Sequence, residues 1–198
     1  MPPEHPPQGR DDDALMVATA RGDEAAFRML VERWSPRLLA FLTRALGRRA
    51  DAEDLTQETF LRIYRAAPRY QPTGRFAPWL FRIGGNLARA ELRRRKVRGW
   101  LLGTSEPSAE EILSSLPSPP CFDADGPLHD AETRAALATA LAGLPERQRL
   151  AVLLHYFEGM KLRLVAAALG TSEHAAESLV ARGATALRRD LRAHRPGA

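Results

Sequence analysis

Cysteine and long apolar runs are the scarcest features of this chain of 198 residues. The single cysteine, Cys121, excludes an internal disulfide framework and a cysteine-rich metal site. No apolar run approaches the roughly 18 residues that a membrane-spanning helix needs, so we expect no membrane insertion. The first residues also lack the apolar segment typical of a signal peptide, which predicts a cytoplasmic protein.

Lysine is almost absent as well, and the positive charge is unevenly distributed. Only Lys96 and Lys161 are lysines among 29 basic residues, and the formal net charge is +5. Arginine has a planar fork that suits phosphate groups and base edges. A GC-rich genome would also raise the arginine content, but it does not explain why the charges cluster. No lysine or arginine lies between Arg98 and Arg134, where prolines and acidic residues repeat, as is typical of a linker.

Apolar residues recur at helical spacing on both sides of this acidic interval, and no stretch alternates as a strand does. We therefore predict an all-α protein of two small helical domains joined by a flexible acidic linker. The expected division is a disordered tail at 1–13, a first domain at 14–98, the linker at 99–128 and a second domain at 129–193.

Two helices of the first domain carry an unusual distribution of charge. The stretch 51–62 predicts an amphipathic helix whose outer face is acidic. After a polar loop at 68–75, a helix from Phe76 places its basic residues opposite its apolar face. Its end, 93–96, is a run of four basic residues that repel one another unless an anionic group compensates. Aromatic residues lie nearby, and basic groups beside aromatics are what single-stranded DNA recognition needs, although Trp79 and Phe81 fit a core role better.

The second domain has the pattern of a helix-turn-helix. A short helix at 162–169 is followed by a Gly-Thr-Ser turn, and Ser172 is placed to cap a longer helix that ends near Arg192. Any two packed helices with such a corner give the same pattern, so this signal is weak by itself. Outward-facing residues of the last helix that can reach base edges or phosphates are His174, Glu177, Ser178 and Arg182.

No arrangement of residues indicates catalysis. The five histidines are scattered along the chain, and no metal-ligand spacing occurs. We therefore expect no enzyme, no metal, no cofactor and no small-molecule substrate.

Taken together, short stretches of both domains resemble the extracytoplasmic-function (ECF) class of bacterial RNA polymerase sigma factors. They follow one another in family order and spacing: DAEDLTQETF at 51–60, FAPWLFRI at 76–83, NLA at 86–88, LRRR at 92–95, LPERQR at 144–149, YFEG at 156–159 and LGTSE at 169–173.

The resemblance implies a transcription initiation factor with three partners: core RNA polymerase, promoter DNA and an anti-sigma protein. It implies that the polymerase clamp is bound by Asp51, Asp54, Gln57 and Glu58. It implies that the −10 element is melted and captured by the loop at 68–75 together with Arg75, Arg82, Asn86, Arg89 and Arg93. Reading of the −35 element falls to Ser172, His174, Glu177, Ser178 and Arg182.

The chain departs from the family pattern at several positions. Many relatives carry an aspartate where Ala90 stands, and an arginine often occupies the position of Gly85. Adjacent glycines at 84 and 85 inside a helix each cost about 1 kcal/mol. Basic residues often stand where Glu177 and Leu179 are found here, which implies an altered −35 preference.

Two other functions share parts of this pattern. A sigma mimic would sequester an anti-sigma protein without directing transcription, and the weakly basic last helix is compatible with that role. A stand-alone helix-turn-helix regulator would bind duplex DNA tightly by itself. The acidic helix favours a working sigma factor, because a decoy has no need of a polymerase-docking face.

Overall fold

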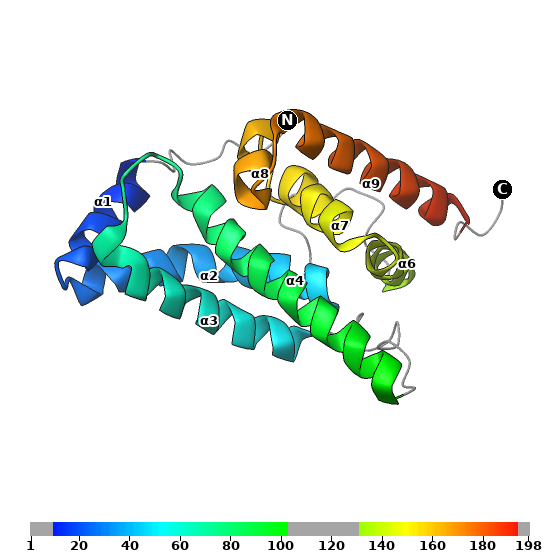
Figure 1. Cartoon of the computed structure of the whole chain (residues 1–198), viewed down its shortest axis with the longest axis horizontal. Helices are drawn as coiled ribbons and strands as arrows, with labels where there is room; N and C mark the ends of the chain where they lie inside the picture. Colours follow the sequence, from blue (N-terminus) through cyan, green and yellow to red (C-terminus); the bar gives the residue numbers. More distant parts are fainter. Residues whose placement is uncertain (1–9, 103–130, 194–198) are drawn as a thin grey trace.

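The computed structural model describes residues 10–102 and 131–193, and every regular element in these two ranges is a helix. The first group comprises α1 (Arg10–Ala20), α2 (Glu24–Leu46), α3 (Arg49–Ala66), the 3-10 turn η1 (Ala67–Arg69) and α4 (Phe76–Leu102). The second group comprises α6 (Ala131–Ala142), α7 (Glu146–Val152), the π-helical turn η2 (Leu153–Phe157), α8 (Leu162–Leu169) and α9 (Glu173–Ala193). The predicted all-α class is confirmed (Figure 1).

Two of the predicted boundaries are wrong. Helix α1 begins at Arg10, so residues 10–13 are not part of a disordered tail. Asp12 and Asp13 are buried because α1 is bonded to α2 and to the loop before α4. Helix α4 continues to Leu102, so residues 99–102 are helical rather than linker. The rest of the expected tail (1–9) and of the linker, including Cys121, lies outside the described residues.

Helix α2 is the long central element of the first group, and local signals set its ends. The Asp23 carboxylate accepts a hydrogen bond from the Ala26 amide at 3.1 Å, and Gly47 ends the helix with φ 73°. Pro36 predicts a break or a kink, and the break is absent, because α2 passes through this residue as one helix. Proline removes a single backbone donor, and here α2 packs against α1, α3, α4 and α6, which holds both of its halves.

An aromatic cluster forms the core beneath α4. Trp34 lies 5.9 Å from Phe76 and 6.2 Å from Phe81, and Phe41 lies 5.1 Å from Phe81, measured between ring centroids. All four side chains are almost fully buried, so the expected core role of Phe81 is confirmed. Burial of such large rings supplies much of the hydrophobic stabilisation of this group.

Close packing explains why a glycine stands at position 84 inside α4. A Cβ atom at this position would lie 2.9 Å from Leu38 Cδ1 and 3.5 Å from Thr59 Oγ1. Helix α4 therefore crosses α2 and α3 closely enough that the site has little room for a side chain. The cost of glycine in the helix is offset by the closer packing that it permits.

The two groups of helices pack into one body with a continuous core. Helix α8 lies against α4, while α6 and η2 lie against α2. Figure 1 shows α4 running diagonally between α3 and the second group. Most of the buried apolar residues of both groups belong to a single cluster.

Gly183 has the same role as Gly84 where α9 crosses α7. A Cβ atom there would lie 2.6 Å from Val152 Cγ2 and 3.3 Å from the Gln148 carbonyl oxygen. Alanine inside a helix normally stabilises by about 1 kcal/mol relative to glycine, whereas overpacking a core costs about 1–3 kcal/mol. We expect Gly183→Ala to lower the free energy of unfolding by about 1–2 kcal/mol in urea titrations.

Gly143→Ala is the matched control for this prediction. A Cβ atom at Gly143 would make only ordinary contacts, the nearest at 3.6 Å from the Ala140 carbonyl oxygen. This variant is expected to be as stable as the parent or slightly more so. If Gly183→Ala has the same free energy of unfolding as Gly143→Ala, the close crossing of α9 and α7 is contradicted.

Candidate nucleic-acid and protein-docking interfaces

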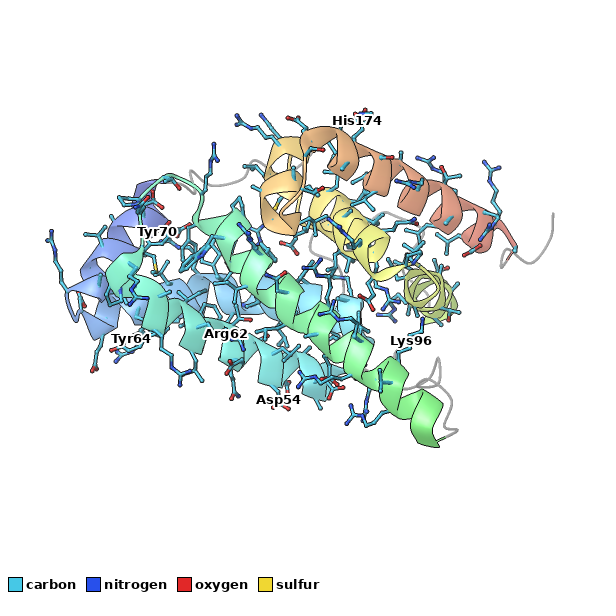
Figure 2. All side chains as sticks on the ribbon, viewed as in Figure 1. Asp54, Arg62, Tyr64, Tyr70, Lys96 and His174 are labelled. Atoms are coloured by element: carbon cyan, nitrogen blue, oxygen red, sulfur yellow. The ribbon has the colours of Figure 1, made fainter. Side chains whose placement is uncertain are left out.

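One exposed face of α3 carries most of the acidic residues expected to bind a protein. Asp54 and Gln57 are exposed, and the Glu58 carboxylate forms an ion pair with Arg62 at 2.7 Å. Leu61, which is 49% exposed, lies on the same stripe and was missed from the sequence. The spacing 54, 58, 61 would have found it, because positions three and four apart share one helix face. We call Asp54, Gln57, Glu58 and Leu61 the α3 docking face; Figure 2 marks Asp54 on it.

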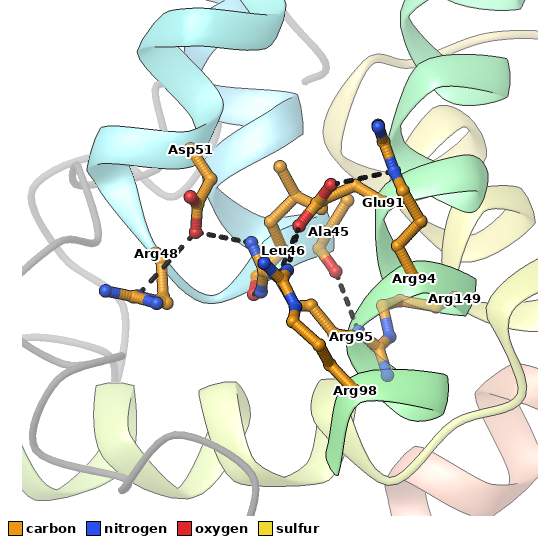
Figure 3. Close-up of polar contacts among 9 residues, drawn as sticks. All are labelled: Ala45, Leu46, Arg48, Asp51, Glu91, Arg94, Arg95, Arg98 and Arg149. Atoms are coloured by element: carbon orange, nitrogen blue, oxygen red, sulfur yellow. Dashed lines mark hydrogen bonds and ion pairs between the residues drawn. The ribbon is translucent and has the colours of Figure 1, made fainter. Parts of the chain in front are cut away.

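Asp51, the remaining acidic residue expected at this surface, is bound by arginine side chains of the same protein. Its carboxylate accepts from Arg95 Nη2 at 2.5 Å and lies 3.6 Å from Arg48 Nε (Figure 3). The same Arg95 donates to the Leu46 carbonyl oxygen at 2.8 Å, at the end of α2. Asp51 therefore joins α3 to α4, whereas Asp54 points away from both.

The basic run at the end of α4 is compensated partly from within the chain. The Glu91 carboxylate forms ion pairs with Arg94 at 3.2 Å, Arg95 at 3.3 Å and Arg98 at 3.2 Å. Figure 3 shows these groups beside the end of α2. Within the predicted run at 93–96, Arg94 and Arg95 thus share an acidic partner inside the protein, while Arg93 stays exposed.

A groove runs between α3 and α4, and basic groups line its sides. Its lining residues are Arg62, Asn86, Leu87, Ala90, Arg93, Arg94, Val97 and Arg98. Asn86 and Arg93, both expected to bind DNA, meet here, and the Asn86 side-chain oxygen accepts from Arg89 Nη2 at 2.5 Å. Ala90 leaves the groove apolar where relatives often carry an aspartate. An extended polyanion fits the charge of this groove.

Arg82 and Arg89 lie on the side of α4 that faces the second group of helices. The Arg82 guanidinium lies beside Gly170, with its Nη2 atom 3.7 Å from the position of a Cβ at that glycine. The pKa of Arg89 is lowered, first by burial and then by the nearby charges of Arg147 and Arg93. A phosphate beside Arg89 would relieve this crowding of like charges.

Polar contacts join the two helix groups along a line that we call the interdomain seam, made by Arg37, Arg44, Arg149, Phe157 and Glu158. Arg37 Nε donates to Glu158 Oε2 at 3.1 Å, and Glu158 is only 5% exposed. The Arg44 guanidinium lies 5.0 Å from the centre of the Phe157 ring, a cation–π contact.

Arg149 is a buried basic group of the seam, with 8% of its surface exposed. Its Nη1 atom donates to the Ala45 carbonyl oxygen at 2.7 Å, and Nη2 donates to the carbonyl oxygens of Ala142 and Leu144. Ala45 lies in the last turn of α2 and Ala142 ends α6. One guanidinium thus caps two helix C-termini, where backbone carbonyls lack partners and the helix dipole is negative.

The loop at 68–75 is held at two points by α1. Tyr70 Oη donates to Asp13 Oδ1 at 2.5 Å, and the Gly74 amide donates to Asp13 Oδ2 at 2.6 Å. Burial raises the pKa of Tyr70, and the hydrogen bond to Asp13 raises it further. The Tyr70 ring packs against Trp79 with centroids 5.0 Å apart, so Trp79 is half-buried rather than a free platform. Arg75 is exposed beside this loop.

The expected helix-turn-helix is present in α8 and α9. Gly170 adopts φ 61° in the turn, and Ser172 Oγ accepts from the Ala175 amide at 3.2 Å. His174, Glu177 and Arg182 are exposed on α9, and Figure 2 places His174 at the edge of the molecule opposite Asp54. Arg182 Nη2 donates to the Ser178 hydroxyl at 3.1 Å.

Leu179 has a structural explanation. It is half-buried and packs against the core rather than facing outward with Glu177. The apolar side chain at position 179 therefore does not change the exposed surface of α9. Of the two departures on this helix, only Glu177 does.

Comparison with known proteins assigns the family. The chain matches the family model "Sigma-70 region 2" over residues 30–98 and the model "Sigma-70, region 4" over residues 134–187. It is 37% identical to the RNA polymerase sigma factor NccH of Alcaligenes xylosoxydans xylosoxydans over 86% of this chain and 89% of that protein. It is 35% identical to the ECF RNA polymerase sigma factor SigE of Mycolicibacterium smegmatis over 90% of this chain and 67% of that protein. The chain belongs to the ECF class of sigma-70 factors.

Solved structures agree with this assignment. The sigma factor is similar to CnrH in its complex with the cytosolic domain of CnrY, with a TM-score of 0.68 and 27% identity over 92% of this chain and 98% of that one. The fold is also that of RpoE in complex with the anti-sigma factor NepR from Bartonella quintana, with a TM-score of 0.67 and 24% identity over 85% of this chain and 98% of that one.

Membership of the family makes this protein a promoter-directing transcription initiation factor, and sigma factors are non-enzymatic. Within residues 10–102 and 131–193, no cluster of three or more side chains is suited to a metal ion. No helix in the described part of the sigma factor is long and apolar enough to span a bilayer.

Proposed function

We propose that this sigma factor binds core RNA polymerase through the α3 docking face, melts and captures the −10 element with loop 68–75 and α4, and reads the −35 element with α9. It does so in the cytoplasm as a binding factor rather than an enzyme. The observation that carries the proposal is the pairing of the exposed acidic face of α3 with the basic groove on α4 beside it.

The two surfaces suit different partners. An exposed leucine ringed by acidic and amide groups is typical of a protein interface, where an apolar centre sits inside a polar rim. The groove between α3 and α4 suits an unwound strand, whose phosphates are neutralised by arginine.

Region 4 in this arrangement covers part of the proposed DNA surface. Arg82 lies beside Gly170 after α8 but stays exposed, whereas Arg89 is half-buried near Arg147 of α7, so region 4 is proposed to move before a promoter can contact Arg89 fully. The free sigma factor is therefore proposed to bind duplex promoter DNA poorly. CnrH was solved with the cytosolic domain of CnrY, and RpoE was solved with the anti-sigma factor NepR. These complexes support the proposal that an anti-sigma protein binds this chain.

Reconstitution tests the proposal directly. Purified chain and core polymerase are expected to initiate transcription at a subset of promoters, while core polymerase alone does not. The free chain is expected to bind the same duplex promoters at least about 1000-fold more weakly than the holoenzyme, the usual gap between specific and non-specific binding. Tight, specific binding by the chain alone would favour a stand-alone regulator, and an inactive mixture that still binds an anti-sigma protein would favour a sigma mimic.

The same reaction, run on a promoter library, tests the reading of the −35 element. The exposed Glu177 can accept a hydrogen bond from a cytosine amine in the major groove. Replacement of Glu177 by alanine is expected to remove a preference for cytosine at one −35 position. An unchanged preference would remove this role.

A further inference from the structure

Helix α1 contributes a residue that the proposed promoter machinery would otherwise lack. We propose that Asp13 is a positioning residue that fixes loop 70–75 in the shape required for −10 recognition. This inference rests on the proposed function, because it assumes that the loop contacts the −10 element. Asp13 itself is 7% exposed and would not touch DNA.

Both oxygens of the Asp13 carboxylate are committed to the loop. Oδ1 accepts from the Tyr70 hydroxyl at 2.5 Å, and Oδ2 accepts from the Gly74 amide at 2.6 Å. These two partners lie at the two ends of the exposed segment 71–74. A single carboxylate thus sets the distance between the ends of that segment, which is what defines the shape of a short loop.

The loop itself has few other means of holding its shape. Residues 71–75 are all exposed, and a Cβ added at Gly74 would meet nothing within 4 Å. Gly74 has φ 68°, in the left-handed region that glycine adopts without strain. The contact of the Gly74 amide with Asp13 therefore selects one conformation from a segment that is intrinsically free to adopt several.

Helix α1 is rigid enough to serve as the fixed support. Met16 is fully buried in the core, and the neighbouring Asp12 carboxylate forms an ion pair with Arg33 of α2 at 2.7 Å. The Tyr70 ring is also packed, 5.0 Å from Trp79 and 6.3 Å from Phe76 between centroids. Asp13 consequently connects a loop with an open surface to two packed elements.

Three substitutions separate positioning from simple folding. Asp13→Ala removes both hydrogen bonds, and Tyr70→Phe removes only the first. Asp13→Asn is the conservative variant: its carbonyl oxygen can accept from the Gly74 amide while its NH₂ group donates to the Tyr70 hydroxyl oxygen. Each variant is tested as holoenzyme for polymerase affinity and for promoter opening, measured by the reactivity of unpaired thymines near position −10.

Asp13→Ala is expected to keep polymerase affinity within about twofold while promoter opening falls about tenfold or more, the size of a lost hydrogen bond to a charged group. The preference among −10 sequences should weaken in parallel. Asp13→Asn is expected to recover opening to within about threefold, and Tyr70→Phe should lie between. If Asp13→Ala opens promoters as the parent does, with the same sequence preference, the positioning role is overturned.

Hydrogen exchange on the free chain keeps this result distinct from a failure of the proposed function. The Gly74 amide should exchange about tenfold faster in Asp13→Ala than in the parent and in Asp13→Asn. Faster exchange together with unchanged opening would mean that the loop is held by Asp13 but does not read the −10 element. Unchanged exchange would remove the structural part of the inference, and if Asp13→Ala fails to fold, the other two variants answer both questions.

Discussion

Charge reversal at Asp54 is expected to remove binding to core RNA polymerase almost completely while the fold stays intact. Asp54 is exposed at one end of the α3 docking face, so an arginine at this position disturbs no packed side chain. An arginine would oppose the basic partner that such a face attracts. Loss of an interface hot spot together with like-charge repulsion should raise the Kd for core polymerase about 100-fold.

Glu53→Arg is the matched control for Asp54→Arg. It makes the same change of charge on the same helix. Glu53 lies at the edge of the docking face, away from Glu58 and Leu61, and pairs with Arg49 at 2.8 Å. The control should bind polymerase within about threefold of the parent, since an exposed ion pair contributes little. Binding is measured by titration of labelled sigma factor with core enzyme. Equal affinities for the two variants would show that the α3 docking face is misassigned.

Replacement of Arg149 by methionine is expected to have the largest effect on stability. The change keeps much of the buried volume but leaves the carbonyl oxygens of Ala45, Ala142 and Leu144 without their shared donor. Buried acceptors that lose a charged donor should lower the free energy of unfolding by about 3 kcal/mol. Urea titration measures the loss, and hydrogen exchange should show the ends of α2 and α6 opening first.

Arg147→Met is the control for this prediction, because Arg147 lies on the same helix and is exposed. Its effect on stability should stay within about 0.5 kcal/mol, as is usual for surface positions. A similar loss for both variants would mean that the effect arises within α7 rather than from the capping of two helix ends.

Local signals suffice to place some of the helix ends. Asp23, Gly47 and Ser172 act on neighbouring backbone groups within a few residues, so their effect can be inferred without a fold. Pro36 is the exception: its local preference is overridden by packing along α2, which depends on residues remote in sequence. The seam could not be predicted for the same reason, since Arg37 and Glu158 are separated by 121 positions.

The candidate sites, too, could be predicted from the sequence only in part. Helical spacing predicted that Asp54, Glu58 and Arg93 point away from the core, and the structure agrees. Which molecules these side chains bind stays a prediction. The same spacing cannot reveal that Asp51 is held by Arg95, or that Arg89 faces region 4, because both depend on how α4 meets its neighbours. Asp13 gave no signal at all, as it stands in a run of three aspartates next to a proline-rich segment.

The ion pair between Arg37 and Glu158 limits how freely the halves of such proteins can be exchanged. A hybrid that took region 4 from a relative lacking an acid at this position would leave Arg37 facing a carbonyl group and no carboxylate. A hybrid that lacked Arg37 instead would remove an ion-pair partner from an acid that is only 5% exposed. A stable hybrid should therefore need both residues of the pair. We expect these two positions to vary together among homologous sequences.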